Sequence, residues 1–201
     1  MTRAFRCRWA CEELEIPYEA VEVDLRSGEH RGEEYRKLNP YERVPTLVDG
    51  DLVLTESAAI CTYLAEKNPE KGLVPRVGTV DRARYDQWMF FCMSELDSAV
   101  WNVAKHKFAL PEERRVPAEI ETARWEFGVA ARRVAAGLAG RSHILGERFS
   151  AADILIGHTL LWGERAKALD RADPAFGGAI ASYLERLTER AAFRRALAIK
   201  I

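Results

Sequence analysis

Two short segments of this sequence carry residue types that could hold a small zwitterionic ligand. Glu56 and Ser57 stand at the predicted start of a helix, where unpaired backbone amides, a hydroxyl and a carboxylate can bind an anion and an amine. Val44 and Pro45, which follow Arg43, precede a predicted strand, where a proline fixes the backbone and removes one ladder donor. Taken alone, each segment also fits a structural role, as a helix cap or a strand start. Together they could offer one ligand a strand edge, a carboxylate pocket and an ammonium pocket.

The cysteines and histidines do not form a pattern typical of a metal or redox centre. No Cys-x-x-Cys pair occurs, and no cluster of histidine, cysteine and acidic residues has the spacing of metal ligands. Cys7 and Cys11 are four residues apart and would share a helix face, which favours buried structural thiols. We therefore expect no metal. Core positions are also expected for Cys61, Cys92, His106, His143 and His158.

The composition argues against several classes of protein. The chain has 201 residues with 30 basic and 31 acidic side chains, so its net charge of -1 provides no basic field for nucleic acid. No apolar run approaches the ~20 residues that cross a bilayer, and the first residues lack the apolar centre of a signal peptide. The sequence therefore predicts a cytoplasmic protein with neither nucleic acid nor a membrane as its partner.

The first 68 residues mix helical and strand-like periodicity, which is typical of an α/β domain. Pro17 ends the first helical pattern, and Asp49-Gly50 between two apolar runs is a strong signal for a hairpin turn. The expected elements are a helix over residues 6–14, a strand over 18–25, a short polar helix or loop over 27–39, a hairpin over 46–54 and a helix over 56–66.

A segment rich in proline and glycine, residues 69–80, separates this domain from the rest of the chain. After it the strand signals stop and long helical patterns follow. These patterns cover residues 81–107, 117–138, 150–169 and 179–190, with a short tail to residue 200. We therefore expect an α/β plus all-α fold, in which residues 1–68 form the first domain, 69–80 a linker and 81–201 an all-helical domain.

The helix expected after residue 149 begins with a capping box. Ser150 is followed three residues later by Asp153, just before the apolar run Ile154-Leu155-Ile156. Such a pair satisfies backbone amides at a helix start and contributes roughly 1 kcal/mol to stability. We therefore expect a structural role for both residues, and the same holds for Trp162 farther along this helix.

Three segments of the chain closely resemble soluble glutathione transferases of the bacterial, zeta and phi types. They are FRCRWACEELEIPYEAVEVDL, GEHRGEEYRKLNPYERVPTLVDGDLVLTESAAICTYLAE and GERFSAADILIGHTLLW, and the resemblance covers nearly the whole chain. It implies a thioredoxin-like first domain that binds glutathione and a helical second domain that builds a pocket for an electrophile. It also implies a homodimer, and the opposite net charges of residues 1–68 and of the remainder, -5 and +4, suit such docking.

The resemblance assigns glutathione contacts to the residues introduced first. The cis-proline loop of the family matches Val44-Pro45, and the main chain of Val44 would pair like a strand with the cysteinyl part of glutathione. Glu56 and Ser57 match the acidic-serine pair that holds the γ-glutamyl ammonium and carboxylate.

Three basic residues are further candidates, for the glycine carboxylate of glutathione. His30 and Arg31 match a basic pair of phi-like members, and Arg43 comes directly before the cis-proline loop. A solvated helix face is an equally good interpretation of His30 and Arg31.

The family opens with a strand that precedes its catalytic loop, and this sequence is expected to begin after that strand. Thr2 then matches the hydroxyl residue that supports the glutathione thiolate in zeta members, whereas phi-type spacing places that residue at Met1. Two explanations are open. Either the natural chain starts upstream with the missing strand, or the strand has been lost and the activity could be lost with it.

The resemblance implies an enzyme that uses glutathione as co-substrate, as a thiolate directed at a small and largely apolar electrophile. Its main catalytic task is to lower the thiol pKa from ~8.5. Arg3, Arg6 and Arg8 could supply a positive field for this, with helix-surface solvation as the alternative. Conjugation, isomerisation and dehalogenation are all open, and so is a binding or interaction module without turnover.

The electrophile pocket is expected along the helix over residues 81–107. Met89, Cys92 and Met93 are adaptable apolar side chains on this helix. Trp101 and Lys105 are four residues apart and share a face that could hold an anionic aromatic electrophile. A plain core or dimer contact is the alternative for each of these residues.

Overall fold

The computed structural model describes residues 2–176 and 178–199, which form two compact units. Of the described residues, the first unit takes in 2–74 and 190–199, and the second unit lies between Pro75 and Glu189. The expected order, an α/β part followed by an all-helical part, is confirmed. Among the described residues, no helix is both long and apolar enough to cross a membrane.

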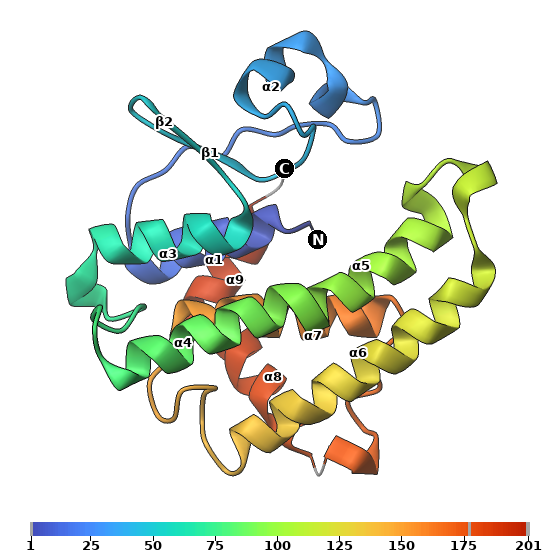
Figure 1. Ribbon diagram of the computed structural model, residues 1–201. Coiled ribbons are helices and arrows are strands. Elements are labelled where there is room, and N and C mark those ends of the chain that lie inside the picture. The colour runs from blue at the N-terminus through green and yellow to red at the C-terminus, as the bar shows by residue number, and fades with distance from the viewer. Residues whose placement is uncertain (1, 177, 200–201) are drawn as a thin grey trace. The chain divides into compact units, whose positions relative to one another are not determined.

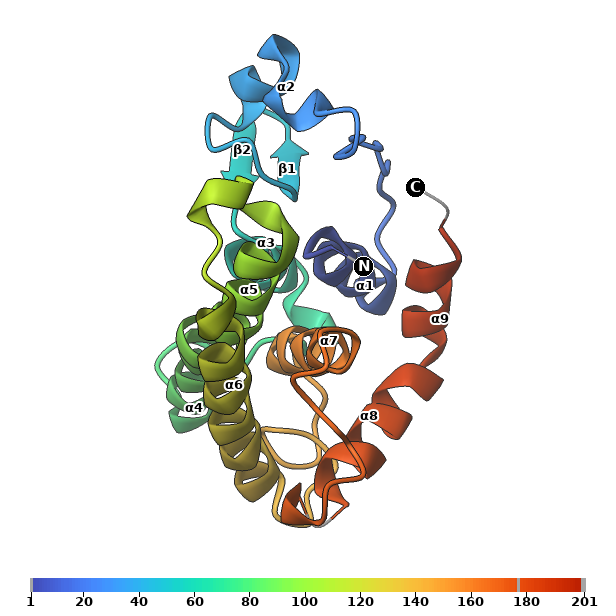
Figure 2. The ribbon, with the colours of Figure 1, turned by 90° about the vertical axis from the view of Figure 1, so that its right-hand side faces the viewer.

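The core of the first unit is a group of helices packed on one another. They are α1 (Ala4–Leu14), α3 (Ser57–Lys67) and α9 (Ala191–Ala198). Figures 1 and 2 show α1 between the other two. The ring of Phe193 in α9 meets the rings of Phe5 and Trp9 edge-on, with centroids 5.2 and 4.9 Å apart. These buried aromatic rings recur at helical spacing on α1, which explains why this segment forms a helix with one apolar face.

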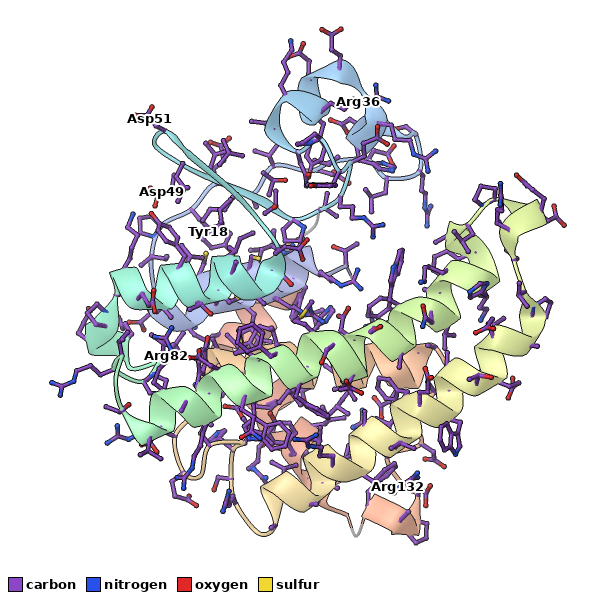
Figure 3. The ribbon with its side chains drawn as sticks, viewed as in Figure 1. Tyr18, Arg36, Asp49, Asp51, Arg82 and Arg132 are labelled. Atoms are coloured by element: carbon purple, nitrogen blue, oxygen red, sulfur yellow. The ribbon has the colours of Figure 1, made fainter. Side chains whose placement is uncertain are left out.

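The predicted hairpin is present as β1 (Thr46–Asp49) and β2 (Leu52–Thr55), paired antiparallel. Gly50 in the turn has a φ of 59°, which glycine adopts at little cost. The Asp49 carboxylate accepts a hydrogen bond from the Tyr63 hydroxyl at 2.8 Å and pairs with Lys67, and both bonds hold its pKa below the ordinary value. Figure 3 shows Asp51 at the tip of the hairpin and Asp49 nearer to α3. These contacts hold the hairpin on α3.

The strand predicted over residues 18–25 is wrong. Residues 16–24 have no regular secondary structure, and the Val21 side chain is 74% exposed. A strand needs a neighbouring strand for its backbone hydrogen bonds, and within the described residues β1 and β2 pair only with each other. The polar segment after it forms two short turns of helix, as expected: η1 (Glu29–Arg31) and α2 (Glu33–Leu38).

The last helix differs from the expectation that residues 81–201 form one domain. α9 packs on α1 of the first unit and is joined to it by ion pairs. Arg190 binds the Glu13 carboxylate through two nitrogens at 2.6 and 2.7 Å, and Arg195 binds Glu12 at 2.6 Å. Periodicity predicts that a terminal segment is helical, but it does not specify which surface the helix covers.

The second unit consists of helices. Its elements are α4 (Val80–Phe91), η3 (Cys92–Asp97), α5 (Ser98–Ala104), η4 (Lys105–Ala109), η5 (Glu112–Arg114), α6 (Pro117–Leu138), α7 (Ala151–Arg165), η6 (Pro174–Phe176) and α8 (Ala179–Glu189). The stretch from α4 to η4 is one continuous helix, as predicted, with wider π-helical turns at η3 and η4. The first ten residues of α7 are all buried, so α7 is the core helix of this unit (Figure 2).

The capping box at the start of α7 is confirmed. The Asp153 carboxylate accepts the backbone amides of Ser150 and Ile144, each at 2.8 Å, and the Tyr183 hydroxyl of α8 at 2.9 Å. Burial raises the pKa of Asp153, and these hydrogen bonds oppose the rise. The side chain therefore joins a helix start, a loop and a second helix, which is the structural role predicted for it.

Candidate functional site

The register of the hairpin brings the two candidate segments to the same end of the sheet. Thr46 pairs with Thr55, so the residues just before β1 and just after β2 are neighbours. The residue before Thr46 is Pro45, joined to Val44 by a cis peptide bond, as the family resemblance implies. The residues after Thr55 are Glu56 and Ser57. The sheet edge and the start of α3 therefore meet at one place.

The start of α3 is not closed by its own side chains. Glu56 occupies the N-cap position with a φ of 66°, which is uncommon for a residue other than glycine, and no side-chain hydrogen bond caps the helix. The Glu56 side chain is exposed, whereas Ser57 is buried. Backbone amides of the first turn of a helix have no partners inside the helix. This end of α3 can therefore bind an anion, with a carboxylate nearby for an amine.

A buried arginine of α1 lies against this end of α3. Nη1 of Arg6 donates a hydrogen bond to Oγ of Ser57 over 3.1 Å. Arg6 is fully buried, so helix-surface solvation, the alternative for the three arginines of this segment, is wrong for it. The bond also places the first turn of α1 at the site, where the backbone carbonyl of Thr2 accepts the amide of Phe5 at 3.1 Å. Thr2 itself is exposed at the start of this turn.

Two residues of the α2 region hold the loop before the cis bond, and neither has a sequence pattern that marks it for this role. The Tyr35 hydroxyl and the Asn39 amide nitrogen both donate to the Arg43 carbonyl, each at 2.6 Å. The Tyr35 hydroxyl also lies 2.9 Å from Oγ1 of Thr46. Asn39 is buried, although Asn39-Pro40 indicates only a helix stop in the sequence. These bonds fix the loop in which Val44 presents its backbone.

The three basic candidates for a carboxylate occupy different surroundings. His30 lies in η1, and its Nδ1 is buried with no hydrogen-bond partner among the described residues. Arg31 and Arg43 are exposed. A shielded imidazole nitrogen without a partner is costly to bury, and a ligand could supply the missing bond. The glycine-carboxylate role of these residues remains a prediction.

Two thiols of α1, Cys7 and Cys11, are not suited to act as nucleophiles. A hydrogen bond to the Cys61 thiol, together with burial, raises the pKa of Cys7 well above the ordinary value. Burial raises the pKa of Cys11 to about 12. A thiol reacts as a thiolate, so both groups are essentially unreactive at neutral pH. Neither Cys7 nor Cys11 is therefore expected to supply a thiolate at this site.

The second unit contains the residues predicted to contact an electrophile. The Trp101 ring lies 6.3 Å from the ring of Trp162 in α7, which in turn lies 6.4 Å from the His158 ring. Both Trp101 and Lys105 are half-buried, and Lys105 begins η4. The pair is therefore next to an aromatic cluster, and its role in binding an electrophile remains a prediction.

A separate open groove of about 520 Å³ lies in the second unit. One wall is the continuous helix that contains α4, η3 and α5, and the other wall is α6. Its lining includes Phe91, Glu95, Trp125 and Arg133, and it includes neither Trp101 nor Lys105. The Arg133 guanidinium lies over the Phe91 ring, 4.6 Å from its centroid. The lining of the groove therefore combines aromatic rings with acidic and basic side chains.

The chain is similar in sequence to known proteins. Residues 1–66 match the family described as glutathione S-transferase, N-terminal domain. The chain is 30% identical to glutathione S-transferase GST-4.5 of Xanthomonas campestris pv. campestris over 159 residues. The matched stretch covers 79% of this chain and 75% of that relative. Glutathione S-transferase 1 of Zea mays is 42% identical over a shorter stretch of 85 residues, 42% of this chain and 39% of that relative.

Solved structures are similar over nearly the whole chain. A glutathione S-transferase of a sphingomonad, complexed with glutathione, is 31% identical with a TM-score of 0.83, over 97% of this chain and 92% of that one. The theta-class enzyme of Xanthomonas axonopodis pv. citri, with glutathione bound, is 30% identical with a TM-score of 0.82, over 100% of this chain and 94% of that one. The fold thus defines a thioredoxin-like α/β unit with an all-helical unit after it. The chain belongs to the glutathione S-transferase family of enzymes.

Proposed function

We propose that the protein is a cytoplasmic transferase that binds glutathione and directs its thiolate at a small, largely apolar electrophile. The main chain of Val44 pairs with the cysteinyl part of glutathione, as an added strand pairs with a sheet edge. Ser57 and the first amides of α3 bind the γ-glutamyl carboxylate, and Glu56 binds the ammonium group. The observation that carries the proposal is the meeting of cis Val44-Pro45 with Glu56-Ser57 at one end of the hairpin.

Thiolate formation is assigned to the first turn of α1. The Thr2 hydroxyl donates a hydrogen bond to the glutathione sulfur, and the helix dipole of α1 adds positive potential at this end. The thiol proton passes to solvent, and the sulfur lone pair forms the bond to the electrophilic carbon. In a substitution the displaced electron pair departs with the leaving group, and in an addition the π pair of the activated double bond moves to the neighbouring atom, which then takes a proton from solvent. Since the protein's own thiols Cys7 and Cys11 have raised pKa values, they do not compete for the electrophile.

The electrophile is assigned to the second unit, at Trp101 and Lys105. The aromatic cluster around Trp101 offers an apolar wall, and the Lys105 ammonium offers a charge for an anionic aromatic compound. Steady-state kinetics of Trp101→Ala and Lys105→Ala test this assignment. The KM for the electrophile is expected to rise while that for glutathione stays constant, and equal changes in both would place the pocket elsewhere.

Calorimetric titration with glutathione tests the proposed binding site. Ser57→Ala removes the hydroxyl and is expected to weaken binding about tenfold, because a hydrogen bond to a charged group is lost. Ser27→Ala is the matched control, since Ser27 is an exposed serine of the same unit. Equal affinity of Ser57→Ala and the parent would contradict the site.

Turnover distinguishes the remaining alternatives. Turnover is measured with three compounds in the presence of glutathione. An activated chloronitrobenzene reports conjugation, a glutathione-dependent isomerisation substrate reports isomerisation, and a haloalkane reports dehalogenation. Binding of glutathione without turnover of any of them would favour a binding or interaction module. Thr2→Ala is expected to raise the pKa of the thiol of bound glutathione, because a hydrogen bond to the thiolate is lost, and the pH dependence of the thiolate absorbance measures this change.

The homodimer is proposed with the open groove of the second unit as part of its interface. Trp125 and Val129 line this groove and are 68% and 42% exposed, and exposed apolar side chains around a groove are typical of interfaces. The opposite net charges of the two parts of the chain favour contact between unlike units of two copies. Sedimentation at low micromolar concentration is expected to show a dimer that Trp125→Glu dissociates, and a monomeric parent would contradict it.

A further inference from the structure

Arg6 has a charged side chain in a core position. Its exposed fraction is 0%, that of Ser57 is 1%, and the two side chains are joined by a hydrogen bond of 3.1 Å. Arginine is almost never fully buried unless its charge is engaged, because removing the charge from water costs free energy. The bond joins residues 51 positions apart on two different helices. Its location at the open start of α3 suggests a role in ligand binding.

The chemistry of the two groups fixes the direction of this hydrogen bond. A guanidinium has donors and no acceptor, so Oγ of Ser57 accepts and one of its lone pairs is occupied. The single proton of the Ser57 hydroxyl therefore points away from Arg6 and is left for another acceptor. A serine hydroxyl at a helix start otherwise turns among several local backbone partners. Arg6 thus converts Ser57 into a donor of fixed direction.

Arg6 also places a positive charge behind that donor. Away from water a charge is screened much less than it is at the surface. A carboxylate bound at Ser57 would meet the hydroxyl proton, the amides of the first turn of α3 and this charge on the same side. A neutral group at the same point would gain little from the charge, so the arrangement favours a carboxylate.

We infer that Arg6 is a positioning residue of this site, which acts through Ser57 and selects ligands that carry a carboxylate there. The inference rests on the proposed function, in which this carboxylate is the α-carboxylate of the γ-glutamyl residue. The competing explanation is that Arg6 only joins α1 to α3. The two explanations differ in whether the effect of Arg6 depends on the carboxylate of the ligand.

The experiment compares two ligands on a set of variants by calorimetry. The ligands are glutathione and an analogue in which 4-aminobutyryl replaces γ-glutamyl, so that the amine is kept and the α-carboxylate is absent. The variants are Arg6→Met, Arg6→Lys and the control Arg8→Met, a substitution on the same helix at a half-buried arginine whose Nη1 binds the Ile199 carbonyl. Thermal unfolding of each variant is recorded beside the titrations.

Arg6→Met is expected to weaken glutathione binding about tenfold and to leave the affinity for the analogue nearly unchanged. Arg6→Lys, which keeps a charge and a donor, restores part of the loss, and Arg8→Met changes neither affinity. In a Ser57→Ala background, Arg6→Met is expected to weaken glutathione binding by a smaller factor than it does in the parent, because the part of its effect that acts through the hydroxyl is already lost. If Arg6→Met does not fold, the affinities for glutathione and for the analogue are compared in Arg6→Lys instead. A smaller loss of affinity is then expected for glutathione, and no loss for the analogue.

Equal losses for both ligands, or no loss for either, would overturn the inference. The parent could bind glutathione more tightly than the analogue, with the same ratio of affinities in the Arg6 variants. That result would overturn the role of Arg6 and leave the proposed function standing. A parent that binds neither ligand overturns the proposed function and the inference with it.

Discussion

The helices α3 and α7 begin with the same kinds of side chain, a serine and an acidic residue, but use them differently. At α7, Ser150 and Asp153 bond to each other, and Asp153 also accepts hydrogen bonds from a loop and from α8. At α3, Glu56 is exposed and does not cap the helix, while Ser57 accepts a hydrogen bond from another helix. The first start is closed by its own residues, and the second has no side-chain cap.

The order of the two residue types explains the difference. Ser150 precedes its helix and stands at the N-cap, where its hydroxyl and the acid three residues later reach each other's amides. In α3 the acid comes first and the serine is already the first helical residue, so this reciprocal closure does not form. In this protein the serine-first order forms a reciprocal cap, and the acid-first order leaves the helix start without one.

The largest expected effect concerns the closed start. Asp153→Ala removes the acceptor of hydrogen bonds from Ile144, Ser150 and Tyr183 and leaves buried donors unsatisfied, so a loss of about 3 kcal/mol or more in unfolding free energy is expected. Urea unfolding measures it. Asp170→Ala, at an exposed turn, is the control. A loss below about 1 kcal/mol would break the comparison, because α7 would then not depend on its capping network.

A smaller effect is expected for the serine of the same box. Ser150→Ala removes one side chain of the capping box and is expected to cost about 1 kcal/mol of unfolding free energy. Glutathione affinity is expected to stay the same, in contrast to Ser57→Ala. The comparison fails if Ser150→Ala weakens glutathione binding as much as Ser57→Ala does while both variants stay folded in thermal melts.

The smallest effect is a gain at the open start. Glu56 has a φ of 66°, a strained conformation for a residue with a β-carbon, so Glu56→Gly relieves about 1 kcal/mol of strain and loses roughly half of that to chain entropy. A net rise of about 0.5 kcal/mol in unfolding free energy is therefore expected, together with weaker glutathione binding. Denaturant unfolding and calorimetry on the same preparation measure both. A lower stability would mean that the Glu56 side chain supports α3 rather than a ligand.

Local signals predicted much of the fold. The Asp49-Gly50 turn between two apolar runs predicted the hairpin, and periodicity with a proline at its start predicted α6. Both features depend on residues that are close in sequence. The strand expected over residues 18–25 depends on a partner elsewhere, and alternation alone cannot show whether a partner is present.

Part of the candidate site was also open to prediction. Val44-Pro45 and Glu56-Ser57 were identified from residue type and family resemblance, and the hairpin register brings them together. The supporting residues Tyr35 and Asn39 were missed because their partners are backbone atoms, which have no signature in the sequence. Arg6 looks like a surface arginine until the packing of α1 on α3 is known.

The packing of α9 on α1 also has a consequence for how the protein is made. The second unit is continuous from Pro75 to Glu189, so all of its residues have been synthesised once Glu189 is joined to the growing chain. The first unit begins earlier but needs Arg190, Phe193 and Arg195 to cover α1. The face of α1 that α9 covers therefore stays open during synthesis until this later segment has been made. The packing around α1, the first helix of the described residues, is therefore completed only when α9, the last one, is present.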